Sequence, residues 1–115
     1  MGKEEFVSGF ILELRRGTII LCVLGKLKKP TYGYHLISIL SNSGVAVEAN
    51  TLYPLLRRLE SQGLLQSVWH TDTAKPRKYY QTTELGNEIL EILKKHWYST
   101  VNSMSIILEE ESKFE

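Results

Sequence analysis

Two neighbouring arginines stand in a short leucine-rich stretch, and their chemistry is the recognition of phosphates and base edges. Arg57 and Arg58 belong to ANTLYPLLRRLESQGLL, residues 49–65. A guanidinium pairs with a phosphate or contacts a guanine edge through two hydrogen bonds, and Asn50 in the same stretch can reach an adenine or a phosphate. This combination of residue types predicts contact with a nucleic acid.

Further groups with the same chemistry lie elsewhere in the chain. Three tyrosine hydroxyls can donate hydrogen bonds to phosphates: Tyr32, Tyr34 and Tyr53. Three cations add positive charge around a predicted hairpin: Lys75, Arg77 and Lys78. The alternative is an ordinary solvated surface, since Glu60 stands close to the arginine pair. The coincidence of several such groups on one folding unit favours DNA.

The charge of the chain is unevenly divided along its length. Residues 1–81 carry eleven Lys and Arg against six Asp and Glu, a net +5, whereas residues 82–115 carry three against seven, a net −4. The basic part can attract a polyanion and the acidic remainder cannot. Random surface variation is the alternative, so charge alone does not decide.

Other features argue against an enzyme, a metalloprotein and a membrane protein. The histidines His35, His70 and His96 fall on three predicted elements without the spacing of a metal or catalytic site, and no Gly-rich phosphate loop is present. The single cysteine, Cys22, lies in the apolar run IILCVL, which favours a buried inert thiol. That run is far shorter than the roughly 20 residues of a membrane span. We therefore expect no cofactor, no metal, no membrane contact and, without an export signal, a cytoplasmic location.

The apolar spacing in the first half of the chain predicts two helices before the arginine stretch. Steps of three and four residues predict one helix over about residues 4–28. Its stripe consists of Val7, Phe10, Ile11, Leu14, Thr18 and Leu21. Thr31 is the expected N-cap of a second, short helix that ends near Gly44. The segment VAVEAN then leads into the third helix, and such a pair resembles a helix-turn-helix.

The third helix is expected to bury its leucines and expose its polar residues. Leu52, Leu55, Leu56 and Leu59 fall within about 100° on a helical wheel. The residues expected to point away are Asn50, Tyr53, Pro54, Arg57, Arg58 and Ser61. With Asn50 or Thr51 as N-cap, Pro54 occupies the third or fourth helical position, where a missing N–H costs little. Pro54 therefore marks the helix start and Gly63 its end.

Two strands rich in aromatic and β-branched residues are predicted over residues 64–70 and 77–82, with TDTAKP between them. At least one of Tyr79 and Tyr80 is expected in the core. The fold class is then mainly α (α+β). We expect a winged helix-turn-helix over residues 1–82, including the N-terminal helix, and a C-terminal dimerisation helix over residues 83–115. Such a unit places its third helix in the major groove, while the wing touches phosphates or the minor groove.

The last helix is predicted to extend beyond its own domain. Thr82 or Thr83 is its expected N-cap, no proline follows, and about 27 residues give roughly 40 Å, longer than a domain of this size is wide. Its apolar stripe consists of Leu90, Leu93, Trp97, Val101, Met104 and Leu108. A stripe without its own chain to pack on predicts a homodimer.

Three segments together resemble the PadR family of bacterial transcriptional regulators: YGYHLISIL, NTLYPLLRRLESQGLL and PRKYYQTTELG. They occur in the family's order and cover about residues 15–90. The resemblance implies a dimeric repressor whose last helix packs against the partner's first helix, which brings Val7 and Leu14 into the interface. It also implies DNA contact by the Tyr32 region, by Asn50, Thr51 and Tyr53, by the arginines after Pro54 and by the basic residues of the wing.

The single helix after the wing is similar to that of the short PadR subgroup. Some members have a tryptophan at the position of Trp97, and there paired indoles at the dimer centre stack on flat, often cationic, aromatic compounds. The resemblance thus implies a small-molecule site at Trp97, with Ile11, Leu14 and Thr18 as its facing wall. The alternative is that Trp97 only fills the interface. For the whole chain, the rival to DNA binding is a winged helix used for protein interaction, whose binding would depend little on salt or on Arg57 and Arg58.

Overall fold

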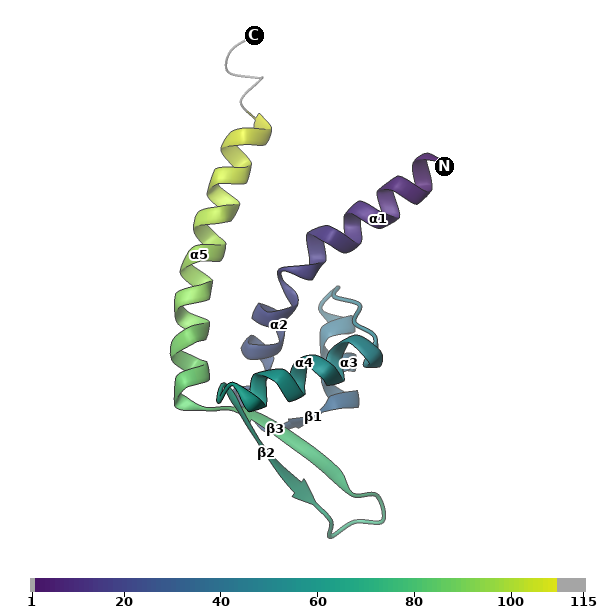
Figure 1. Cartoon of the computed structure of the whole chain (residues 1–115), viewed down its shortest axis with the longest axis vertical. Coiled ribbons are helices and arrows are strands. Elements are labelled where there is room, and N and C mark those ends of the chain that lie inside the picture. The colour runs from purple at the N-terminus through teal and green to yellow at the C-terminus, as the bar shows by residue number, and fades with distance from the viewer. Residues whose placement is uncertain (1, 110–115) are drawn as a thin grey trace.

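The computed structural model describes residues 2–109, and Figure 1 shows shorter helices and a β-hairpin beside the base of one long helix. The elements in chain order are α1 (Lys3–Arg16), α2 (Ile19–Lys26), β1 (Thr31–Tyr32), α3 (Gly33–Asn42), α4 (Ala49–Ser61), β2 (Leu65–His70), β3 (Arg77–Thr82) and α5 (Glu84–Glu109). This is the mainly α, winged-helix architecture that the sequence predicts. The hairpin, the six-residue connection between α3 and α4, and the long last helix are confirmed.

The core joins one face of each helix from α2 to α5 to the inner face of the sheet. Its buried residues are Val23, Leu24, Leu27, Leu36, Leu40, Val47, Leu52, Leu56, Leu59, Leu65, Tyr80 and Leu90. The leucines at steps of three and four in α4 supply the middle of this cluster, as their periodicity indicates. Of the adjacent tyrosines in β3, Tyr80 is buried and Tyr79 is half-buried, because successive strand residues face opposite sides.

The prediction of one helix over residues 4–28 is wrong, because the chain breaks it between α1 and α2. The hydroxyl and the backbone N–H of Thr18 both donate to the carbonyl of Arg15, at 2.9 and 3.0 Å. Such local bonds compete with helical bonds, and the preceding Gly17 has a low helix propensity. Figure 1 shows α1 diverging from α5 beyond this break, and no residue of α1 is buried.

A short strand replaces the expected N-cap of the second helix. Thr31 and Tyr32 form β1 and pair antiparallel with Tyr80 and Tyr79, so the sheet has the order β1-β3-β2. The residue at the N-cap of α3 is Tyr32, not Thr31. Two residues are too few to show an alternating pattern, so only the pairing with β3 reveals this strand. Gly44 does end the helix region with a positive φ of 89°.

Pro54 lies deeper in its helix than predicted. Glu48 is the N-cap of α4 and uses no side-chain hydrogen bond. Counted from Ala49, Pro54 is the sixth helical residue, past the first turn rather than inside it. The cap preferences favoured Asn50 or Thr51 over glutamate, which explains the error. Pro54 is exposed, so the carbonyl that loses its N–H partner lies on the solvent side of the helix.

The long helix α5 begins against the wing and then leaves the core. The hydroxyl of Thr83 accepts a hydrogen bond from Gly86 N at 3.0 Å and donates to the Gly63 carbonyl at 2.6 Å. This confirms Thr83 as the cap. In its 26 residues, only Gly86 and Leu90 are buried, and both lie in the first two turns. None of the helices within residues 2–109 is long and apolar enough to cross a membrane.

Candidate nucleic-acid interface

The buried leucines of α4 fix which of its polar residues face solvent. Leu52, Leu56 and Leu59 point into the core. At about 100° per residue, Asn50, Pro54, Arg57 and Ser61 lie on the opposite side. These four residues are exposed. The protruding face of α4 therefore presents an amide, a guanidinium and a hydroxyl around a rigid proline, and this set can bind phosphates and base edges.

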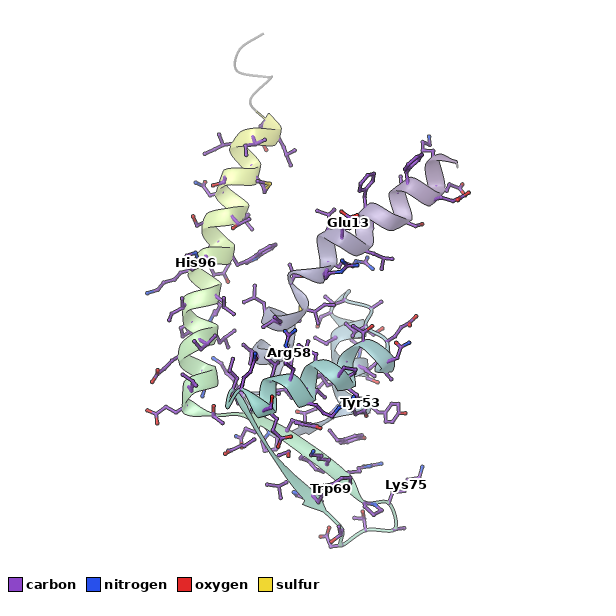
Figure 2. All side chains as sticks on the ribbon, in the orientation of Figure 1. Glu13, Tyr53, Arg58, Trp69, Lys75 and His96 are labelled. Carbon is purple, nitrogen blue, oxygen red and sulfur yellow. The ribbon has the colours of Figure 1, made fainter. Side chains whose placement is uncertain are left out.

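Arg58 and Thr51 lie on one flank of this face rather than on its centre. Both line a groove of about 350 Å³ together with Arg16 and Ile19 from α1 and α2. Figure 2 shows Arg58 on the side of α4 that faces α2. The two neighbouring arginines, equivalent in the sequence, thus occupy different surroundings. Arg57 stands free on the outer face, and Arg58 stands beside a second arginine, Arg16.

Tyr53 lies on the other flank and does not point into solvent as the helical period predicts. Its ring packs on Gly33, where a methyl group would collide with the Tyr53 ring and hydroxyl. The ring also forms an edge-to-face pair with Tyr34, with centroids 5.8 Å apart. Burial raises the pKa of the Tyr53 hydroxyl, with smaller contributions from Tyr34 and Tyr80. The hydroxyl is therefore a neutral donor beside the α4 face.

The three predicted cations of the wing are placed in three different ways. Lys75 is exposed at the hairpin tip (Figure 2). The guanidinium carbon of Arg77 lies 4.4 Å from the centre of the Tyr32 ring. Lys78 faces the opposite side of the hairpin, where its ammonium lies 3.4 Å from the carboxylate of Glu60 on α4. Only Lys75 and Arg77 are thus available to DNA without breaking an ion pair.

Glu60 joins α4 to the wing. Its carboxylate accepts a hydrogen bond from the hydroxyl of Ser67 on β2 as well as pairing with Lys78. Partial burial would lower the pKa of Lys78, but Tyr80 and Glu60 outweigh that effect and raise it. Sequence reasoning placed Glu60 next to the arginines. In the structure Glu60 is neutralised by Lys78 of the wing and not by the arginines.

Two histidines that were not predicted to bind DNA lie against the tyrosines Tyr32 and Tyr79 of the sheet. His70 of β2 stacks on Tyr79 with ring centroids 4.4 Å apart, and His35 of α3 lies 5.6 Å from Tyr32. Both histidines are exposed. They are 35 positions apart in the chain, so no sequence spacing could have joined them. Within residues 2–109, no group of three or more His, Cys, Asp or Glu side chains could hold a metal ion.

Trp97 lines a groove between α5 and α2. The groove measures about 600 Å³, and Thr18, Leu21, Cys22 and Leu90 contribute to its walls. Of the four predicted ligand-site residues, Trp97 and Thr18 therefore share a cavity. Ile11 and Leu14 do not line it, because α1 turns away after the break at Gly17.

The predicted dimer residues fall into two groups. Six of them are exposed: Val7, Leu14, Trp97, Val101, Met104 and Leu108. Leu93 is half-buried against the core, and Leu90 is only 2% exposed. The assignment of Leu90 to the interface is therefore corrected, because its own core leaves no surface for a partner to cover. Helical periodicity predicts which residues form the apolar stripe of α5. It does not predict which of them pack within their own chain and which are left for a partner.

A helix-turn-helix formed by α3 and a protruding α4, a basic hairpin and a projecting terminal helix defines the class of winged-helix DNA-binding regulators. Residues 20–92 match the family described as "Transcriptional regulator PadR-like family". The chain belongs to this family and is a DNA-binding transcriptional regulator, not an enzyme.

Known proteins agree with this assignment over most of the chain. A PadR family transcriptional regulator from Eggerthella lenta has a crystal structure with a TM-score of 0.87 and 48% identity, covering 92% of this chain and 95% of its own. A PadR family regulator from Clostridium difficile R20291 gives a TM-score of 0.73 at 30% identity, covering 79% and 98%. The transcriptional regulator Rv3488 of Mycobacterium tuberculosis is 34% identical over 79 residues, 68% of this chain and 74% of that protein.

Proposed function

We propose that the protein is a homodimeric, cytoplasmic repressor. In this proposal its two α4 helices occupy successive half-sites of an operator, and a flat aromatic molecule bound near Trp97 releases it. The observation that carries the dimer is the exposed apolar surface on two helices. On α1, Phe6, Phe10 and Leu14 are 53%, 59% and 77% exposed. The far half of α5 is similar, because the apolar residues of its stripe, Val101, Met104 and Leu108, are between 42% and 78% exposed. Surfaces of this size on soluble proteins mark interfaces.

The dimer is tested by placing a charge in the exposed stripe of α5. Val101→Lys puts an ammonium on the same side of α5 as Trp97 and Met104, so desolvating it in an interface is costly. The matched control is Ser99→Lys, which adds the same charge on the opposite side of the helix. We expect a dimer mass by light scattering for the wild type and Ser99→Lys, and a shift toward monomer for Val101→Lys. A dimeric Val101→Lys, or a monomeric wild type, would contradict this interface.

The DNA-contact residues are tested by affinity measured against salt. A duplex contact that neutralises phosphates releases counterions, so the affinity should fall steeply as salt rises. Changing Arg57 and Arg58 together to Ala should weaken binding at least about tenfold if each contact contributes ~1 kcal/mol. Because Arg57 stands on the outer face and Arg58 on the flank, Arg57→Ala should account for more of the loss. The rival, a protein-interaction module, predicts that binding to its partner changes little with salt or with these arginines.

The ligand proposal rests on the groove at Trp97, and the groove also indicates the chemistry of the ligand. Among residues 2–109, three lysines line it, Lys26, Lys28 and Lys94, and no carboxylate does. One of them, Lys94, is paired with Glu91 at 3.3 Å. One turn beyond Trp97 the helix carries the apolar Val101. This lining favours a planar compound with a neutral or acidic substituent over the cationic compounds that the family resemblance suggests.

Fluorescence quenching tests the ligand site. Planar dyes of matched size, one with a sulfonate and one with an ammonium, are titrated into the wild type, Trp97→Ala and Trp69→Phe. Trp69 lies on the hairpin (Figure 2) and is the internal control. We expect the acidic dye to quench the wild type and Trp69→Phe but not Trp97→Ala. Quenching of Trp69 alone would refute the proposed ligand site at Trp97. Release from DNA further requires that the dye bind free and DNA-bound dimers with different affinity.

A further inference from the structure

Five side chains from four elements form one continuous patch on the outer face of the wing. We call it the wing platform: Tyr32 of β1, His35 of α3, His70 of β2, and Arg77 and Tyr79 of β3. The rings of Tyr32 and Tyr79 meet edge to face at 5.5 Å in its middle. Arg77 stacks on Tyr32, while His35 and His70 lie against Tyr32 and Tyr79. Two half-buried tyrosines thus support three exposed groups that are positive or can become positive.

Among residues 2–109, no acidic side chain forms an ion pair with a residue of the wing platform. The ion pairs Lys78–Glu60 and Lys94–Glu91 involve no residue of the platform. Glu60 lies on the opposite, α4-facing side of the hairpin, as its pairing with Lys78 shows. The residues of α3, β1, β2 and β3 that carry a fixed charge are Arg77 and Lys78. The turn between β2 and β3 adds Asp72 and Lys75. All of these are exposed except Lys78. The platform therefore suits an anion.

The wing platform is continuous with the recognition surface of α4. Gly33 directly follows Tyr32, and the ring of Tyr53 from α4 packs on it. In Figure 1, β1 and the start of α3 lie between α4 and the hairpin. A duplex lying on the outer face of α4 therefore passes close to the platform. DNA offers one phosphate charge per ~1.7 Å of its axis, so phosphates are available along this whole path.

We infer that the wing platform binds backbone phosphates of the DNA, and that His35 and His70 bind them as imidazolium ions, so that DNA binding takes up protons from the solvent. This inference rests on the proposed DNA contact through α4. The imidazole group changes charge near neutrality, at about pH 6.5, and both of its nitrogens donate when it is charged. A phosphate against the ring favours that charged form. Tyr32 is then a positioning residue for Arg77 and His35, in addition to being a hydroxyl donor.

The test measures affinity against pH with a labelled duplex of random sequence, which suffices because phosphate contacts are uniform across sequences. Between about pH 7.5 and 5.5 we expect wild-type binding to tighten at least about tenfold, since two histidines per protomer gain charge. The slope of log affinity against log salt concentration should also steepen, by about one for each added phosphate contact. His35→Gln with His70→Gln should abolish both effects. The matched control is His96→Gln on α5 (Figure 2), which should behave like the wild type.

Two results would overturn the inference: a wild type whose affinity does not change with pH, or a double variant that keeps the change. If the double variant does not fold, calorimetry on the wild type decides, because proton uptake makes the heat of binding depend on the ionisation enthalpy of the buffer. Equal heats in two buffers at about pH 6.5 would refute proton uptake. A failure of the proposed DNA contact through α4 can be distinguished from these results. In that case the Arg57→Ala variant would bind DNA as tightly as the wild type at pH 7.5.

Discussion

Gly86 stands where the last helix meets the wing, and its replacement by alanine is predicted to destabilise the fold. A methyl group at this position would collide with the carbonyl oxygen of Leu64, with the carbonyl carbon at 3.1 Å. That carbonyl also accepts a hydrogen bond from the N–H of Thr83 at 3.0 Å, and Gly86 N donates to the Thr83 hydroxyl. Because the obstacle is backbone, neither a rotamer change nor a small side-chain shift can relieve the contact.

The size of the effect follows from three contributions. Overpacking that moves backbone costs about 1–3 kcal/mol, and weakening the Thr83 to Leu64 hydrogen bond costs about 1 kcal/mol. Alanine offsets roughly 1 kcal/mol through its better helix propensity. The net loss is about 2 kcal/mol, and for a domain of this size that lowers Tm by roughly 10 °C.

Thermal unfolding followed by circular dichroism measures this loss, at one fixed concentration because dimerisation makes Tm concentration-dependent. The matched control is Gly25→Ala in α2, where an added methyl group meets nothing within 4 Å. Helix propensity should there raise stability by about 0.5–1 kcal/mol. The two substitutions are chemically identical and have opposite expected signs. A Gly86→Ala protein at least as stable as the wild type would refute the steric argument.

Two further predictions concern the recognition surface and the cysteine. The three atoms nearest to the methyl group of Gly33→Ala all belong to the end of the Tyr53 side chain, so the ring should swing out with little loss of Tm. DNA binding should then weaken about fivefold, because the ~1 kcal/mol edge-to-face contact that positions this hydroxyl is lost; unchanged affinity in a gel-shift series would show that Tyr53 takes no part. Burial raises the pKa of the Cys22 thiol, so its alkylation at pH 7.5 should be slower in the native than in the unfolded protein, and equal rates would contradict this.

Local patterns account for what could be predicted of the fold. The leucine period of α4, the aromatic and β-branched residues of the two hairpin strands, and the uninterrupted stripe of α5 depend on neighbours within a few residues. The break between α1 and α2 was harder to predict, because the bond from the Thr18 hydroxyl to the Arg15 carbonyl competes with helical hydrogen bonds. The strand β1 exists only because β3, nearly 50 residues further on, supplies its partner.

The sequence by itself determined that this chain is a winged helix with cations on its third helix and hairpin, since residue type and period fix both. The tertiary structure alone decided how those cations are used. It turned Arg58 to the flank of α4, paired Lys78 with Glu60, moved Leu90 into the core, and brought His35 and His70 to one aromatic pair. The physical reason is that a side chain's surroundings depend on segments far apart in the chain, and only the packing of the helices against the sheet sets them.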